Sequence, residues 1–219
     1  MKIFAIVPAK KFENAKTRLS PMLMPDERID LSFIMLSNTL KILSNSQAVT
    51  KVIVVSADRR AEEVARGHGA IFLDEEIEAG VNSAVAIADK YCIKQGADAT
   101  LVIPQDIPLL DTEDIMMACD LAKNDDNCIV ICPSSRYDGT SLLLRKPPTI
   151  IKTYYDSDSY QAHVESAREL GIPVKLFFSK KLMHDIDTPE DARELVTRAP
   201  IDENKIAEFL YDKVLRLSS

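Results

Sequence analysis

Hydrophobic positions in this chain fall into short apolar runs separated by longer segments with helical spacing. The short runs, rich in valine, isoleucine and leucine, predict buried strands at residues 2–7, 51–56, 70–73, 99–103 and 128–132. Between them, apolar residues three or four positions apart predict helices at 25–43, 57–66, 80–94 and 112–123. Strand and helix alternate, so we expect an α/β fold with right-handed crossovers and a mixed, mostly parallel sheet with helices on both faces.

The pattern loosens after residue 132. Strands are expected at 140–145 and 173–178, with a helix at about 159–170 between them. Two helices, near 188–198 and 202–217, close the chain, and without repeats or linkers residues 1–219 read as one domain. The final helix carries Ile206, Leu210, Val214 and Leu217 at about four-residue steps. This apolar stripe needs a partner, either within its own domain or across a homodimer interface.

Composition narrows the class of protein. Hydrophobic residues make up 46% of the chain, and 34 acidic against 27 basic residues give a net charge of −7. This charge argues against a nucleic-acid partner, although a local basic pocket can still exist. No run approaches the ~18 apolar residues of a membrane span, and the first apolar run is too short for a signal peptide. The four cysteines form no C-x-x-C pair, so we expect a cytoplasmic protein with reduced, packed cysteines and no membrane partner.

Ligands of open α/β sheets lie beyond the carboxyl ends of the strands, and the loop after the first strand is unusually basic. Lys10, Lys11, Lys16 and Arg18 place four cations within nine residues of an acidic protein. These cations would suit a triphosphate, which carries about four negative charges, although lysine-rich loops are also often simply solvated. The loop matches neither the Walker A sequence nor the dinucleotide-binding fingerprint.

Gly80 and Asn82 stand where the acidic loop after the third strand meets the next helix. Glycine allows a ligand to approach the backbone closely, and an asparagine amide both donates and accepts hydrogen bonds to a base. The alternative is that these residues only begin the helix.

Three aspartates predict a site for a divalent cation. Asp106 follows the fourth strand between two prolines, and Mg²⁺ prefers carboxylate oxygens that also bridge to substrate phosphates. Asp185 and Asp187 share one face if their segment is extended, and so could join Asp106. Asp187 or Thr188 could instead cap the helix that follows. Carboxylates, a basic loop and no evident nucleophile together indicate metal-assisted phosphoryl chemistry with Mg²⁺ as the cofactor.

Five motifs occur in order along the chain: AKTRL at 15–19, GVN at 80–82, QDIPLL at 105–110, DGTSLLL at 138–144 and DIDTP at 185–189. Together they resemble the 2-phospho-L-lactate guanylyltransferase family of coenzyme F-420 biosynthesis. The resemblance implies a fold similar to the nucleotide-diphospho-sugar transferases, with a seven-stranded mixed sheet. It also implies transfer from GTP to 2-phospho-L-lactate, or to a related acid such as phosphoenolpyruvate, with release of pyrophosphate.

The basic loop and the resemblance together assign roles to specific side chains. The assignments are catalysis by Lys16, Arg18 and Asp106; nucleotide binding by Lys10, Lys16, Gly80 and Asn82; acceptor binding by Thr140, Ser159 and His163; and Mg²⁺ binding by Asp106, Asp185 and Asp187. GTP and a small phosphorylated acid are the expected partners.

Three positions depart from the family pattern. Gln105 stands where a glycine is usual, and Asp156 and Asp158 replace two glycines of the acceptor segment. The added acids should repel an anionic acceptor, which leaves its identity open. A molybdopterin or sugar-phosphate transferase of the same fold usually has a glycine-rich first loop, but residues 1–66 contain no glycine. A non-catalytic nucleotide-binding module is the remaining alternative.

Overall fold

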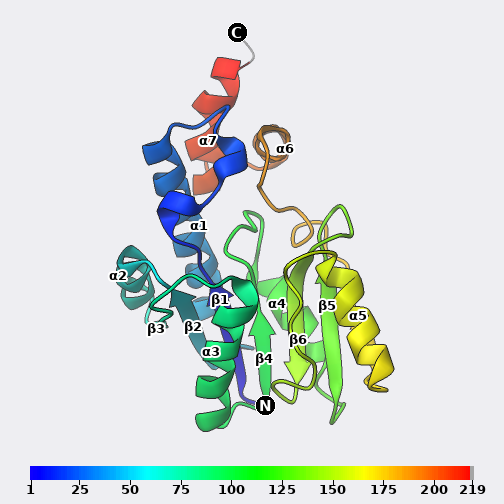
Figure 1. Ribbon diagram of the computed structural model, residues 1–219. Helices are drawn as coiled ribbons and strands as arrows, with labels where there is room; N and C mark the ends of the chain where they lie inside the picture. The colour runs from blue at the N-terminus through cyan, green and yellow to red at the C-terminus, as the bar shows by residue number, and fades with distance from the viewer. Residues whose placement is uncertain (218–219) are drawn as a thin grey trace.

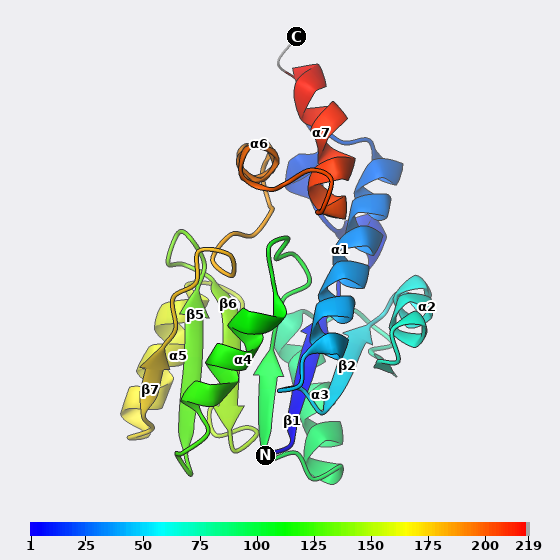
Figure 2. The ribbon, with the colours of Figure 1, turned by 180° about the vertical axis from the view of Figure 1, so that it is seen from behind.

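A single sheet organises residues 1–217, the part of the chain that the computed structural model describes. Its seven strands lie in the order β3-β2-β1-β4-β6-β5-β7, with β3 labelled in Figure 1 and β7 in Figure 2. Their bounds are β1 Ile3–Pro8, β2 Lys51–Ser56, β3 Ile71–Asp74, β4 Ala99–Val102, β5 Cys128–Pro133, β6 Thr140–Lys146 and β7 Val174–Leu176. The helices are α1 Pro25–Asn45, α2 Arg59–Gly67, α3 Val81–Lys94, α4 Thr112–Leu121, α5 Ser159–Glu169, α6 Pro189–Arg198 and α7 Lys205–Leu217.

The sheet is mixed and mostly parallel, as the alternation of elements predicted. β1 pairs in parallel with β2 and β4, and β2 with β3, whereas β6 runs antiparallel to β4 and β5. The short link from β5 to β6 makes this reversal, because a parallel pairing needs a much longer crossover. β1, β4 and β5 are buried along most of their length, which explains why they read as continuous apolar runs.

Helices cover both faces of the sheet. α3 and α5 lie on the face shown in Figure 1, whereas α1 and α4 lie on the face shown in Figure 2. One core cluster joins the sheet to α1, α2 and α4, and a second joins it to α3 and α5. The four cysteines are free and buried in these clusters, as expected of small apolar residues.

A third apolar cluster lies beyond the carboxyl end of the sheet, where α6 packs on α7 and α7 packs on the first half of α1 (Figure 1). Ile206, Leu210 and Val214 of α7 are buried in it. The stripe predicted from sequence is therefore covered by this chain itself, and the side chain of Leu217 lies outside the described residues. None of the helices in residues 1–217 has the length and apolar character needed to cross a bilayer.

Side-chain caps explain two shifted helix starts. α2 begins at Arg59 because Asp58 accepts a hydrogen bond from the Arg60 amide at 3.0 Å. α7 begins at Lys205 because the Asn204 side chain accepts from the Ile206 amide at 3.0 Å. Propensity alone did not reveal that these polar residues precede the helices.

The basic loop after β1 is anchored to the core and is not simply a solvated loop. It forms two short 3-10 turns, Phe12–Asn14 and Thr17–Leu19, which the sequence reading missed. Phe12 and Leu19 are buried, and the Phe12 amide donates to the Asp58 carboxylate at 2.9 Å. The backbone that carries the cations of this loop is therefore anchored to the core.

Candidate active site

Lys16 brings two of the predicted carboxylates together beyond the ends of β1 and β4. Its ammonium nitrogen lies 2.8 Å from Asp106 Oδ2, 3.0 Å from Asp187 Oδ1 and 2.6 Å from the Ile186 carbonyl oxygen. These three acceptors use all three ammonium protons. Only 5% of the side chain is exposed, and the backbone of Lys16 is left-handed, with φ 55°. Lys16 thus adopts a backbone conformation that is energetically unfavourable for a non-glycine residue, and it does so at a cluster of charges.

The charges of the cluster alter one another's protonation. Burial opposes the charged form of Lys16, but the carboxylates of Asp106 and Asp187 outweigh it and raise the lysine pKa. Burial also opposes ionisation of Asp187, yet Lys16, with smaller contributions from Arg18 and Lys10, lowers the pKa of that carboxyl. Burial, followed by repulsion from Asp106 and Asp187, raises the pKa of Asp185 to about 6. A further cation would relieve this repulsion.

The segment 185–187 is fixed from both sides. The Ile186 amide donates to the Asp106 carbonyl at 3.2 Å, and the Ile186 side chain is buried in the third cluster. Thr188, not Asp187, caps α6, since its side chain accepts from the Asp191 amide at 3.3 Å. The choice left open by the sequence is therefore resolved, and the Asp187 carboxylate bonds Lys16 instead.

The three predicted metal ligands are of the chemical type that Mg²⁺ binds. Asp106, Asp185 and Asp187 offer carboxylate oxygens, the ligands that this hard cation prefers. Within residues 1–217, no three His, Cys, Asp or Glu side chains already converge as a metal site. The Lys16 ammonium bonds both Asp106 and Asp187.

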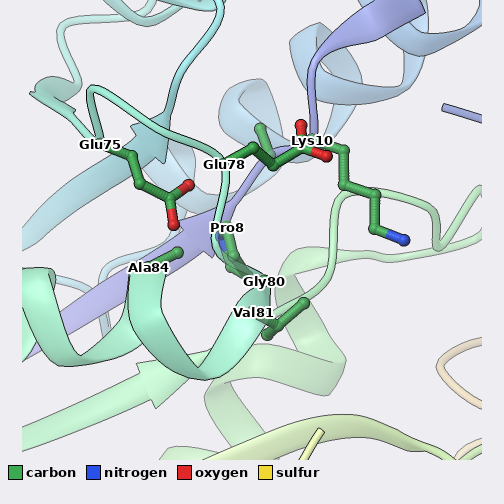
Figure 3. A pocket seen from close by; sticks show the side chains of 8 residues that line it. Pro8, Lys10, Glu75, Glu78, Gly80, Val81 and Ala84 are labelled. Carbon is green, nitrogen blue, oxygen red and sulfur yellow. The ribbon is translucent and has the colours of Figure 1, made fainter. Parts of the chain in front are cut away.

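Three adjoining pockets lie at and beside this cluster. The loop pocket lies between the end of β1, the loop 75–80 and the start of α3 (Figure 3). It shares Pro8, Lys10 and Val81 with a central pocket that also contains Lys16 and Asp106. The central pocket in turn shares Tyr155 and Asp187 with an outer pocket near α5. An elongated ligand can therefore run from the loop pocket past the charge cluster to the outer pocket.

The outer pocket has an unusual charge balance. Two guanidiniums, from Arg18 and Arg136, face five carboxylates. The carboxylates belong to Asp138, Asp156, Asp158, Asp185 and Asp187. Arg18 is 3.8 Å from Asp187, and Arg136 is 3.0 Å from Asp191. An anion could bind here only with the help of these guanidiniums or an added cation.

Of the predicted nucleotide residues, Lys10 and Gly80 line the loop pocket, and Gly80 has a positive φ of 92°. Asn82 lies elsewhere. Its amide nitrogen donates to Asp156 Oδ2 at 3.0 Å, and its oxygen accepts from the Tyr155 amide at 2.9 Å. The Asn82 side chain thus ties the loop before α5 to α3, and both its amide nitrogen and its oxygen already have a partner within the chain.

The predicted acceptor residues do come together, as a buried network behind the outer pocket. Ser159 donates to Thr140 Oγ1 at 3.0 Å, and His163 Nδ1 lies 3.1 Å from the same oxygen. His163 Nε2 accepts from the Tyr154 amide at 2.9 Å, so in the neutral ring Nδ1 carries the proton. Burial, then the charge of Arg145, lowers the pKa of His163 to about 4. The His163 ring is therefore neutral at about pH 7.

The structure adds site residues that sequence reasoning missed or left unassigned. Glu75 directly follows β3 and lines the loop pocket, and Tyr155 lines both other pockets. The rule about strand ends could have found Glu75, whereas no local signal marks Tyr155. Gln105 lines the central pocket, is 8% exposed, and has a side-chain oxygen without a hydrogen-bond partner.

Comparison with known proteins shows the family to which the chain belongs. The family model described as "Guanylyl transferase CofC like" matches residues 1–218. The chain belongs to this guanylyl transferase family. It is 37% identical over 199 residues to phosphoenolpyruvate guanylyltransferase of Conexibacter woesei, covering 90% of this chain and 89% of that protein. It is 35% identical over 196 residues to 2-phospho-L-lactate guanylyltransferase of Methanothermobacter thermautotrophicus, covering 90% and 85%.

Solved structures with the same fold support the fold assigned to this guanylyl transferase. A candidate nucleotide-diphospho-sugar transferase from Desulfovibrio desulfuricans superposes with a TM-score of 0.79 at 17% identity, over 99% of this chain and 98% of that one. A CMP:2-keto-3-deoxy-manno-octonic acid synthetase in complex with CTP gives 0.61 at 12% identity, over 89% and 97%. The predicted resemblance in fold to nucleotide-diphospho-sugar transferases is confirmed.

Proposed function

We propose that this chain transfers the guanylyl group of GTP to the phosphate of a small three-carbon acid, such as 2-phospho-L-lactate or phosphoenolpyruvate, in coenzyme F-420 biosynthesis. The observation that carries the proposal is the Lys16–Asp106–Asp187 cluster in the central pocket, which adjoins the outer pocket, in a chain whose relatives are named as guanylyltransferases. Those names give no support to a sugar or molybdopterin acceptor.

The proposed reaction is an in-line displacement. A phosphate oxygen of the acid, held in the outer pocket, attacks the α-phosphorus of GTP and forms a new phosphoanhydride bond. The bond from that phosphorus to the bridging oxygen of the β-phosphate breaks, and pyrophosphate leaves with the electron pair. Lys10 and Arg18 are placed to offset the charge of the phosphates, while Lys16 holds the carboxylates in register.

Asp106, Asp185 and Asp187 would hold the proposed Mg²⁺. When bound, this ion supplies Lewis-acid neutralisation of the triphosphate oxygens. The finding that supports it is the surplus of carboxylates in the outer pocket, which an anionic acceptor could not approach unaided.

Pyrophosphate release tests the proposal. The protein is supplied with Mg²⁺ and GTP, with 2-phospholactate, phosphoenolpyruvate or 3-phosphoglycerate in parallel, and with ATP and CTP as controls. Release with GTP and only one acid would support the transferase and name its acceptor. GTP binding without release for any of the acids would favour the non-catalytic module.

Two further expectations accompany this proposal. We place the reaction in the cytoplasm, where nucleotides and phosphorylated acids meet. Homodimerisation stays a prediction, and it no longer rests on the apolar stripe of α7, because Ile206 and Leu210 are buried within the chain. Sedimentation of the purified protein measures the oligomeric state directly.

A further inference from the structure

We propose that the loop pocket binds the guanine base and that the Glu75 carboxylate selects guanine by accepting hydrogen bonds from its N1–H and 2-amino groups. The inference rests on the proposed function and goes beyond it by naming the residue that distinguishes GTP from other nucleotides. It replaces Asn82, whose amide is engaged by Tyr155 and Asp156, as the side chain that reads the base.

Glu75 is a buried carboxylate whose partners are neutral groups, the Ala79 amide and the Ser83 hydroxyl, and not a cation. It is only 8% exposed, and it forms no ion pair with any described Lys, Arg or His. By contrast, buried Asp58 pairs with Arg60 at 2.7 Å, and buried Asp89 pairs with Arg145 at 2.6 Å. Burial raises the pKa of Glu75. A buried carboxylate that lacks a cation and lines a pocket is a strong indication of a functional site.

The backbone fixes the position of Glu75 in advance. Its amide donates to the Ser56 carbonyl of β2 at 3.1 Å, and its carbonyl accepts from the Ile77 amide at 2.6 Å. On the side chain, Oε1 accepts from the Ala79 amide at 3.2 Å. The neighbouring acid Glu78 is already engaged, because its Oε2 accepts from the Lys11 amide at 2.5 Å. Glu75 is thus the preorganised acceptor in this pocket.

Apolar side chains line much of the loop pocket. Pro8, Val81 and Ala84 supply apolar walls, and Figure 3 shows the Glu75 carboxylate pointing toward Pro8 and Ala84 while Lys10 extends away. Lys10 also lines the central pocket, next to the charge cluster. A nucleotide with its base beside Glu75 can therefore direct its phosphates toward Lys10 and Asp106.

The two oxygens of a carboxylate match guanine better than other bases. Guanine presents two adjacent donors, N1–H and the 2-amino group, on its Watson–Crick edge. Adenine presents an acceptor at N1, which a carboxylate repels. Hypoxanthine keeps N1–H but lacks the 2-amino group, and xanthine replaces that group with a carbonyl. A glutamine at position 75 could accept from N1–H and donate to this carbonyl, so it would suit xanthine.

Equilibrium binding of GTP, ITP, XTP and ATP to the wild type and to Glu75→Gln tests the inference, with Mg²⁺ present throughout. The wild type should bind GTP about 10-fold to 100-fold more tightly than ITP, the effect of one hydrogen bond to a charged acceptor. Glu75→Gln should weaken GTP binding by a similar factor and shift the preference toward XTP. Glu76→Gln makes the same charge change at an exposed position of the same loop, and should leave all four affinities unchanged.

Equal affinity of the wild type for GTP and ITP would overturn the assignment, and this arm needs no variant that might misfold. A Glu75→Gln protein that keeps its preference for GTP over XTP would overturn it as well. Because binding is measured apart from turnover, pyrophosphate release by such a variant would leave the proposed transferase intact. An absence of release in the wild type would refute the transferase without deciding which residue reads the base.

Discussion

At the scale of single residues, the charge cluster depends on one ammonium group that balances two carboxylates. Lys16 is 5% exposed and directly contacts Asp106 and Asp187, whereas Arg18 is 70% exposed and lies 3.8 Å from Asp187. Both cations lie close to the Asp187 carboxylate, but only Lys16 is buried. Removing a buried partner leaves uncompensated charge, whereas an exposed pair contributes little.

We therefore expect Lys16→Met to lower the free energy of unfolding by about 1–3 kcal/mol. Arg18→Met, which also removes one positive charge, should change it by less than about 0.5 kcal/mol. Denaturant unfolding of both variants measures the contrast. Equal effects would show that the cluster is not held together by Lys16.

The buried His163 makes the free energy of unfolding depend on pH in a predictable way. Its folded pKa is lowered to about 4 from 6.5, so between these values the unfolded chain binds a proton that the folded chain does not. The contribution of His163 to the free energy of unfolding is therefore fully present above pH 6.5. It decreases by about 1.4 kcal/mol per pH unit as the pH falls from there toward about 4. From about pH 7 to about pH 5, the wild type should lose about 2 kcal/mol more than His163→Gln. Parallel losses in the two proteins would contradict a buried neutral histidine.

The sequence could place chemical groups at strand ends but could not orient their side chains. Asp106 and Asp187 converge as predicted, because the end of β4 and the start of α6 fix their backbones. The partners of the Asn82 amide could not be foreseen, since they lie on a loop 73 and 74 residues away in sequence. Glu75 was passed over because an acidic loop usually indicates solvent exposure, and its burial depends on tertiary packing.

At the scale of elements, Asp156 and Asp158, which depart from the family pattern, differ in their effect on the start of α5: one side chain forms a stabilising hydrogen bond and the other residue has a strained backbone. Asp158 adopts a left-handed conformation, with φ 43°, just before α5 and makes no side-chain cap. Asp156 accepts a hydrogen bond from Asn82 at 3.0 Å and helps to join its loop to α3. A glycine costs least where φ is positive, which gives a physical reason for the glycine that the family uses at such a position.

We expect Asp158→Gly to be more stable than Asp156→Gly by about 1 kcal/mol or more, since the first relieves backbone strain and the second removes a hydrogen bond. Thermal or denaturant unfolding of the two variants gives the difference. An advantage for Asp156→Gly would indicate that the Asn82 contact contributes nothing.

At the scale of the whole molecule, the third apolar cluster links the final helix to the charge cluster. Leu210 of α7 and Ile186, which sits between two of the aspartates, are both buried in it. The packing of α6 on α7, and of α7 on α1, thus supports the segment that carries Asp185 and Asp187. The sequence predicted the stripe on α7 but not its partner, because an amphipathic pattern specifies a buried face and not the surface that covers it.

Leu210→Ala should cost about 2–4 kcal/mol of unfolding free energy, as expected for a fully buried leucine. Leu215, on the same helix, is 51% exposed, and Leu215→Ala should stay within about 0.5 kcal/mol of the wild type. Denaturant titrations compare the two. Similar costs would mean that α7 does not pack on the chain as described.

The central claim is that the α-phosphorus of GTP is the atom attacked. GTP labelled at either the α- or the γ-phosphorus is incubated with Mg²⁺ and the accepting acid, and the labelled products are separated. The account predicts that the α-label joins the acid while the γ-label leaves as pyrophosphate, and that Asp106→Asn abolishes both without unfolding the protein. Transfer of the γ-label to the acid, or α-label transfer that persists in Asp106→Asn, would contradict it.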